Sequence, residues 1–182
     1  MQKGSVHGVT SLVLAASLTV STSALAAVTG YVSIKGQKQG PLKGESVNAA
    51  RKQWIDVLAF KSGVIVPTDG ATGSPTGRRK HEPVCFTKPW GPASPQLFSS
   101  IVSNETLTEV NFEFVKADQS GKETVFQTIK LTNAQIVEDK QRLGAENEAP
   151  GHTPETFEEI CFTYQRIDIT NNDGHTQATD TW

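Results

Sequence analysis

Cysteine is scarce in this chain: Cys85 and Cys161 are the two among 182 residues, too few for a scaffold held together by disulfide bonds. A long hydrophobic run is also missing. The apolar stretch near the N-terminus, Thr10 to Val20, is about half of the ~20 residues that span a bilayer, so we expect no stable membrane insertion. No charge sign dominates, because the formal net charge is −2. This near-neutrality argues against a nucleic-acid partner held by an overall positive field.

Motifs for catalysis or cofactor binding are missing as well. The sequence contains no GxSxG nucleophile elbow. The glycine-rich stretch Gly70–Gly77 lacks the Lys-Ser or Lys-Thr pair and the following helix of a phosphate-binding loop. His81, His152 and His175 do not have the paired spacing of metal ligands. We therefore predict no catalytic residue, no cofactor and no metal site.

Two pairs of adjacent acids, Glu138-Asp139 and Glu158-Glu159, are the remaining candidates for acid–base chemistry. Neighbouring residues on a strand point to opposite faces of the sheet, so adjacency argues against a shared catalytic site. We interpret both pairs as solvated charge.

The first residues have the pattern of a removable leader. Lys3 gives a weakly basic start, the short apolar run follows, and Ala24-Leu25-Ala26 matches the small-x-small pattern that signal peptidase recognises. The alternative is upstream sequence translated from a wrongly assigned start codon. Residues 1–26 are thus predicted to be a signal peptide or an N-terminal extension, and residues 27–182 a single domain.

From Val28 onward the hydrophobic pattern mostly has a period of two residues, which is typical of strands. In Leu107–Lys116, for example, Val110, Phe112 and Phe114 alternate with polar residues. The other predicted strands are Val28–Lys35, Trp54–Val66 with a bend at Gly63, Glu82–Lys88, Glu123–Val137 and Glu159–Thr170; the segments Gln39–Gln53, Pro67–Gly77 and Asp139–Glu155 are predicted loops.

One helix is predicted after Ser94, which we interpret as the N-cap with Pro95 at the first helical position. Leu97, Phe98, Ile101 and Val102 would form its apolar stripe, with Asn104 as the stop; this set is the expected core-facing side. Six or seven strands and one helix predict a mainly β protein, a compact sandwich or small barrel of two sheets.

The two cysteines occupy matching contexts, Val-Cys-Phe-Thr and Ile-Cys-Phe-Thr. Each points away from the apolar face that its neighbours define. If their strands lie side by side in an oxidising compartment, Cys85 and Cys161 could form a disulfide that closes a long loop. The alternative, that both remain semi-buried thiols, stays open at this point.

A series of short stretches occurs in a fixed order: Gly77–Pro83 (GRRKHEP), Ala93–Leu97 (ASPQL), Thr128–Ala134 (TIKLTNA) and Phe162–Gln165 (FTYQ). Together with Tyr31–Gly36 and Val110–Phe114 they resemble the Hcp family, the tube-forming exported subunit of bacterial type VI secretion systems. The resemblance runs from about Tyr31 to the C-terminus. Each stretch alone is weak, and their number and order make the combination specific.

The resemblance implies two sheets with a helix at the side. It also implies a homo-hexameric ring that stacks into a tube inside a contractile sheath, tipped by a spike protein, with effector proteins in the lumen. No catalytic residue is implied. The loops Gln39–Gln53 and Pro67–Lys80 are our candidates for ring-to-ring contacts, with Arg78, Arg79 and Lys80 as a basic edge facing a neighbouring subunit.

The leader conflicts with this expectation, because family members load into the tube from the cytoplasm. A cleaved signal would make the protein periplasmic instead of secreted through the type VI apparatus. Two alternatives therefore remain: a periplasmic or secreted binding module that kept the fold outside the machine, and a small secreted hydrolase that acts as an effector itself.

Overall fold

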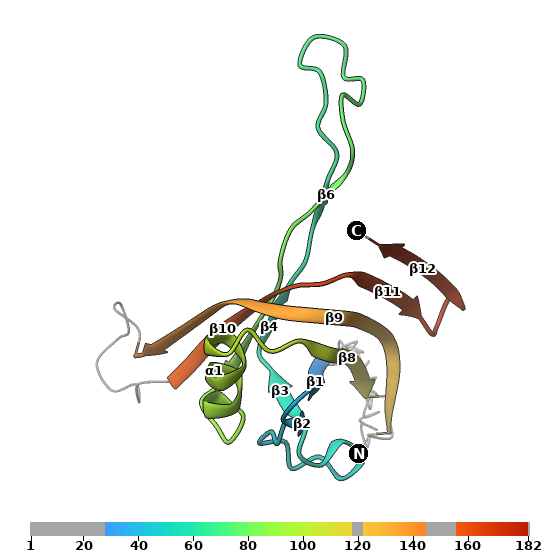
Figure 1. Ribbon diagram of the computed structural model, residues 1–182. Helices are drawn as coiled ribbons and strands as arrows, with labels where there is room; N and C mark the ends of the chain where they lie inside the picture. Colours follow the sequence, from blue (N-terminus) through green and yellow to red (C-terminus); the bar gives the residue numbers. More distant parts are fainter. Residues whose placement is uncertain (1–27, 118–121, 145–155, 182) are drawn as a thin grey trace, which may run out of the picture.

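The computed structural model describes residues 28–117, 122–144 and 156–181. The leader, the predicted turn at 118–121 and most of the predicted loop at 139–155 lie outside these residues. Within them the chain is mostly strand, and Figure 1 shows two curved sheets with one helix at the side. The predicted mainly β class with two sheets is confirmed, although the sheets do not close into a barrel, since β2 and β4 end the strand order.

The strand order is β2-β1-β8-β9-β10-β7-β4, with neighbours antiparallel. Strands β3, β11 and β12 extend this arrangement beside β1 and β9, and β5 pairs with β6 separately. The bounds are β1 Val28–Gly36, β2 Gly40–Pro41, β3 Ile55–Val57, β4 Ala59–Lys61, β5 Val64–Ile65, β6 Lys80–His81, β7 Val84–Pro89, β8 Leu107–Ala117, β9 Glu123–Leu143, β10 Thr156–Thr163, β11 Arg166–Asn171 and β12 Thr176–Thr181, with the 3-10 turn η1 Ala49–Arg51 and the helix α1 Ser94–Val102.

The long strand β9 belongs to both sheets. Its first part pairs with β8 and β11, and its second part pairs with β10. Between them Asn133 has a positive φ of 50°, a conformation that asparagine tolerates better than most residues. The strand therefore turns from one sheet into the other at Asn133.

The core lies between the two sheets and is built by the alternation seen in the sequence. Phe86 stacks on Phe162 at 5.8 Å between ring centroids and meets the edge of Phe112 at 5.6 Å. These rings come from β7, β10 and β8, and Leu131 of β9 is buried with them. Offset and edge contacts of this kind are favourable beyond their buried area, so the rings join the sheets firmly.

Several predicted boundaries were wrong. Strand β9 continues to Leu143 through part of a predicted loop, because Asp139 to Leu143 pair with β10. The predicted strand Glu159–Thr170 is two strands, since the chain crosses between the sheets at Tyr164 and Gln165. The polar tail forms β12, which pairs with β11 despite having no apolar face.

Helix α1 also differs from its prediction. Its N-cap is Ala93, and Ser94 is instead the first helical residue, with its Oγ accepting from Gly91 N at 3.1 Å. The predicted apolar stripe is only half covered, because Leu97 is buried while Phe98 and Val102 are exposed. The helix thus leaves apolar surface facing outward.

Candidate functional site: the arm, its anchor and two buried clusters

A long hairpin, residues 62–82, projects from the body between β4 and β7; we name it the arm (Figure 1). Its two sides are joined by β5 and β6, by a bridge between Thr68 and Pro75, and by backbone hydrogen bonds such as Thr76 N to Pro67 O at 2.9 Å. The two sides of the arm are therefore paired at several points along its length, whereas its glycines and prolines predicted only a loop.

The tip of the arm is ordered by Asp69. Its Oδ1 accepts hydrogen bonds from Ala71 N at 3.0 Å, Thr72 N at 2.8 Å and Thr72 Oγ1 at 3.0 Å. These bonds, the Thr72 backbone first, lower the pKa of Asp69, because they favour the charged form. Gly73, with φ +69°, supplies the left-handed residue that the turn requires.

Three consecutive apolar side chains near the base of the arm remain in solvent: Val64, Ile65 and Val66 are 54%, 52% and 45% exposed. Because neighbouring residues of a strand face opposite sides, Val64 and Ile65 expose apolar surface on both faces of the arm. Exposed apolar side chains on an ordered element are typical of contact surfaces between proteins. The predicted contact residues Arg78, Arg79 and Lys80 lie on the returning side of the same arm and are all exposed.

Asp180 of the C-terminal strand β12 contacts the returning side of the arm, and we name its contacts with Arg79 and His81 the anchor. Both oxygens of this carboxylate accept from the Arg79 guanidinium, and His81 Nε2 lies 2.8 Å from Asp180 Oδ2. Arg79 Nη2 also donates to Thr181 O at 3.2 Å. The Arg79 hydrogen bonds, supported by His81, hold the pKa of Asp180 well below its usual range.

His81 continues this network into the body. The residue is buried, and its Nδ1 lies 3.0 Å from the Tyr164 hydroxyl. Since a carboxylate only accepts, His81 Nε2 donates to Asp180, and in the neutral ring Nδ1 accepts from Tyr164. Burial raises the pKa of Tyr164, and the charge of Asp180 adds to it. His81 is thus a structural residue whose two ring nitrogens are both hydrogen-bonded.

The second predicted contact loop, Gln39–Gln53, is held at two points. Buried Glu105 accepts from Lys38 N at 2.6 Å and Gln39 N at 2.9 Å, and these hydrogen bonds outweigh burial and lower its pKa. Arg51 donates to Glu113 at 2.8 Å and lies over the Tyr31 ring at 5.1 Å. Both ends of the loop are therefore ordered.

A buried ionic cluster lies beneath helix α1. Lys88 and Glu158, both 0% exposed, are cross-strand partners with 3.2 Å between Nζ and Oε1. Glu45 Oε1 is 3.7 Å from the same ammonium, and Ser94 Oγ is 3.3 Å from it. Burial raises the pKa of Glu45, and burial followed by the charge of Glu158 raises that of Asp139. Two carboxylates therefore share one ammonium, and Asp139 lies close enough to feel the charge of Glu158.

The interpretation of Glu158 as solvated charge was wrong, and the cluster was missed. A signal was available, because Glu158 has the same strand parity as buried Ile160 and Phe162, and Lys88 the same as Phe86. Period two thus puts both ions on the inner face of the sheet. The sequence could not show that they meet, since 70 residues separate them.

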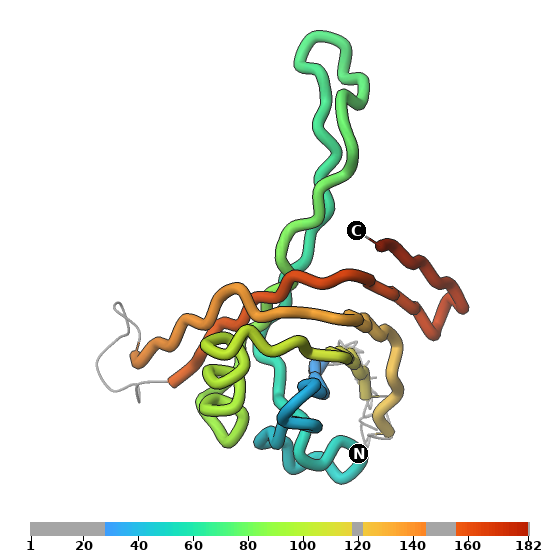
Figure 2. Tube along the Cα trace, in the orientation of Figure 1, coloured from blue at the N-terminus to red at the C-terminus, as the bar shows by residue number. Residues whose placement is uncertain are grey.

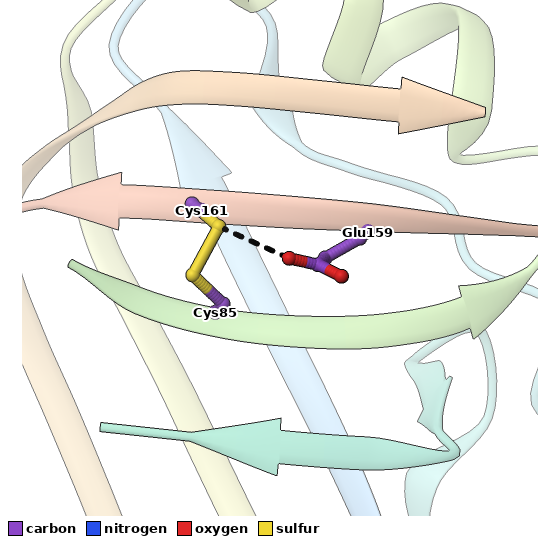
Figure 3. Close-up of side chains that lie close together, drawn as sticks. All are labelled: Cys85, Glu159 and Cys161. Carbon is purple, nitrogen blue, oxygen red and sulfur yellow. Dashed lines mark hydrogen bonds between the residues drawn. A yellow bond between two sulfur atoms is a disulfide. The ribbon is translucent and has the colours of Figure 1, made fainter.

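Cys85 of β7 and Cys161 of β10 are opposite each other, with 4.0 Å between their Cα atoms and their sulfurs bonded (Figure 3). Glu138 and Glu159 lie beside Cys161, at 3.5 Å and 3.8 Å from its Sγ. Both cysteines point to the outer face, away from Phe86 and Phe162. Among the residues described, the sulfurs of Cys85 and Cys161 and a carboxylate oxygen of Glu159 lie within 4.8 Å of one another.

No helix within the described ranges is long and apolar enough to cross a membrane. Apart from the clusters above, the chemistry-bearing residues singled out from the sequence remain scattered. His175 lies in the exposed β11–β12 turn, and His152 lies outside the described residues.

Comparison with known proteins agrees with this fold. A family profile described as "Type VI secretion system effector, Hcp" matches residues 31–170, so the chain belongs to the Hcp family. The "Major exported protein" of Pseudomonas aeruginosa is 32% identical over 166 residues, which cover 86% of this chain and 96% of that relative. The family resemblance predicted from the sequence motifs is confirmed.

Solved structures support the same assignment. Hcp1 from E. coli EAEC 042, in a doubly substituted form, superposes with a TM-score of 0.75 at 28% identity over 86% of this chain and 99% of that one. The secreted protein Hcp3 from Pseudomonas aeruginosa gives a TM-score of 0.68 at 28% identity, with the same shares covered. The fold of this chain is therefore shared with solved members of the Hcp family.

Proposed function

We propose that this protein is the tube subunit of a type VI secretion system. Six copies form a ring, rings stack into a tube inside a contractile sheath behind a spike protein, and effector proteins travel in the lumen. The observation that carries this proposal is the family match over residues 31–170, which includes the whole arm. The role is structural, and the chain performs no chemistry of its own in it.

The shape of the subunit supports stacking. The arm and the loop Gln39–Gln53 lie at opposite ends of the molecule (Figure 2). A contact between different surfaces on two identical subunits repeats without limit along an axis, as a tube requires. In our proposal the exposed apolar residues of the arm, Val64, Ile65 and Val66, pack on the adjacent ring. Their burial there would add a hydrophobic contribution to stacking.

Lateral contacts within a ring have their own candidates. Strands β4 and β12 end their sheets, pairing with β7 and β11 respectively, so each leaves one backbone edge open among the described strands. Phe98 and Val102 leave an exposed apolar face on α1. A neighbouring subunit that covers these surfaces would explain why apolar residues of the helix face outward.

We further propose that residues 27–182 form one domain and that export occurs from the cytoplasm through the type VI apparatus. Support comes from two relatives named "Major exported protein" and "Secreted protein Hcp3". The intact mass of the native protein tests this route. A chain beginning at Ala27 would mean cleavage by signal peptidase, which contradicts a cytoplasmic tube and favours the periplasmic binding module.

The assembly is tested by native mass spectrometry and electron microscopy of the wild type and of Ile65→Asp. We expect hexameric rings in both and stacked tubes in the wild type alone, because a charge at position 65 opposes burial of this side of the arm. Leu143→Asp, an exposed apolar residue outside the arm, is the matched control and should retain stacking. Monomeric wild type at high concentration would refute the tube, and normal stacking of Ile65→Asp would refute the role of the arm.

A further inference from the structure

Four side chains gather on the outer face where β7, β10 and β9 lie side by side. The register aligns Cys85, Cys161 and Glu138 in one row across these strands. Glu159 precedes Cys161 by two residues and therefore projects from the same face of β10. Figure 3 shows Glu159 directed toward the two sulfurs. The row thus combines two sulfur and two carboxylate groups that the sequence spreads over 76 positions.

The spacing of these groups matches a metal coordination shell. One atom each from Cys85, Cys161 and Glu159 lie within 4.8 Å of one another. Cys161 Sγ is 3.5 Å from Glu138 Oε2 and 3.8 Å from Glu159 Oε1. Around a tetrahedral zinc, with Zn–S of about 2.3 Å and Zn–O of about 2.0–2.2 Å, sulfur and oxygen ligands lie about 3.5–3.6 Å apart. Glu138 is therefore already at the distance that a shared ion needs, and Glu159 lies slightly beyond it.

The state of the sulfurs decides what this site can do. The thiolate is the form of cysteine that binds metal ions. A disulfide sulfur carries no negative charge, so the oxidised pair lies beside the two carboxylates but is a poor metal ligand. Reduction by a dithiol transfers two electrons and two protons to the pair and yields two thiols. Two nonbonded sulfurs then separate from each other, still facing Glu159.

We propose that the reduced protein binds one thiophilic divalent cation of the zinc class. The Cys85 and Cys161 thiolates and Glu159 are its ligands, and Glu138 Oε2 or a water takes the fourth position. Binding releases the two thiol protons. Thiolates and carboxylates suit such an ion, because zinc accepts sulfur and oxygen donors in one tetrahedral shell.

The surroundings favour this occupant. The Oε1 atom of Glu138 forms an ion pair with Lys140, and its Oε2 atom lies beside the sulfur of Cys161. Without a cation, two thiolates and two carboxylates on one face would repel one another. A surface pocket of about 490 Å³, lined in part by Lys61, Glu82 and both cysteines, opens onto the site, so an ion can enter from solvent.

Oxidation would reverse the binding. Oxidised glutathione takes two electrons from the two thiolates, accepts two protons, and becomes two molecules of reduced glutathione. The protein sulfurs form the disulfide, and the ion leaves. Strands β7 and β10 are therefore linked by a metal ion in a reducing medium and by a disulfide bond in an oxidising one.

The test is a cobalt titration of the full chain, reduced under anaerobic conditions. We expect saturation at one Co²⁺ per chain with a thiolate-to-cobalt charge-transfer band, which Cys85→Ser abolishes. Glu159→Gln should weaken binding by at least about tenfold, since even outer-shell partners of metal ligands contribute 10–100-fold. Glu109→Gln, an exposed carboxylate elsewhere on β8, is the control and should bind as the wild type does.

A second measurement uses the wild type alone and does not depend on how the variants fold. The reduced, zinc-loaded protein is treated with oxidised glutathione, and free zinc and thiols are counted. Release of one zinc with the loss of two protein thiols supports the site. Absence of the cobalt band in the reduced wild type, or a band that persists in Cys85→Ser, overturns it.

Discussion

Replacing Lys88 with methionine is the sharpest test of the buried ionic cluster. The substitution keeps an unbranched chain of similar length but removes the ammonium that Glu158 and Glu45 contact at 3.2 Å and 3.7 Å. Lys88 and Glu158 are both 0% exposed, so water cannot replace the lost partner. Removing one member of a buried pair leaves an uncompensated charge, and such changes cost about 3–5 kcal/mol.

This cost gives a large shift in urea denaturation followed by tryptophan fluorescence at fixed protein concentration. With a slope of about 2 kcal/mol/M, the midpoint should fall by about 1.5–2.5 M at pH 7. The loss should shrink as the pH approaches about 4, the unfolded pKa of a glutamate. The reason is that a buried carboxyl group deprived of its ammonium costs stability only above its unfolded pKa, because below that pKa it is protonated in both the folded and the unfolded state.

Lys130→Met is the matched control, because Lys130 pairs with Glu109 on the surface, where each side chain is 44% exposed. Exposed pairs contribute about 0–1 kcal/mol, so this variant should stay close to the wild type. The double variant Lys88→Met, Glu158→Gln should recover part of the loss, since the buried charge is gone. Equal midpoints for Lys88→Met and Lys130→Met would refute the reasoning.

Three further predictions concern the anchor, the pH response and the disulfide. Asp180→Asn should speed tryptic cleavage within the arm, because Arg79 and His81 lose their carboxylate partner, whereas Asp168→Asn on the same terminal hairpin should not; equal cleavage would contradict the anchor. Asp139→Asn should stabilise the protein at pH 7 by up to about 1 kcal/mol after allowance for solvent screening. That gain should vanish below the unfolded pKa of 3.8, where the raised-pKa carboxyl is protonated in both states, and a gain that persists there argues against burial as its cause. Reducing the Cys85–Cys161 bond with a chelator present should lower the unfolding free energy by about 4.5 kcal/mol through loop-closure entropy over 76 residues, measured by urea denaturation; an unchanged midpoint would mean that the bond does not constrain the unfolded chain.

Much of the fold followed from local patterning. The alternation around Phe112 and Phe162 correctly predicted strands with one buried face, because side-chain direction in a strand has a period of two. The helix after Ala93 was found from its proline and apolar spacing. The polar strand β12 was not, since β11 and the backbone hydrogen bonds between them stabilise it, and its side chains carry no such pattern.

The candidate sites were less predictable because they form between distant segments. Parity placed Cys161 on the outer face and could have placed Glu158 on the inner face, and the sequence offered Cys85 as the partner of Cys161. It could not show that their strands pair, or that Lys88 is the partner of Glu158. The anchor of the arm depends in the same way on Asp180, about one hundred residues from Arg79. These contacts require the register of the strands to be known.

The sequence by itself therefore determined the class of the protein, its main strands and its family, because periodicity and ordered motifs are local properties of the chain. The tertiary structure decided which charges are buried together, which sulfurs meet acids, and that the glycine-rich loop is an ordered arm. The physical reason is that strand pairing joins residues by register rather than by proximity in sequence. A one-residue difference in register would send each of these side chains to the other face.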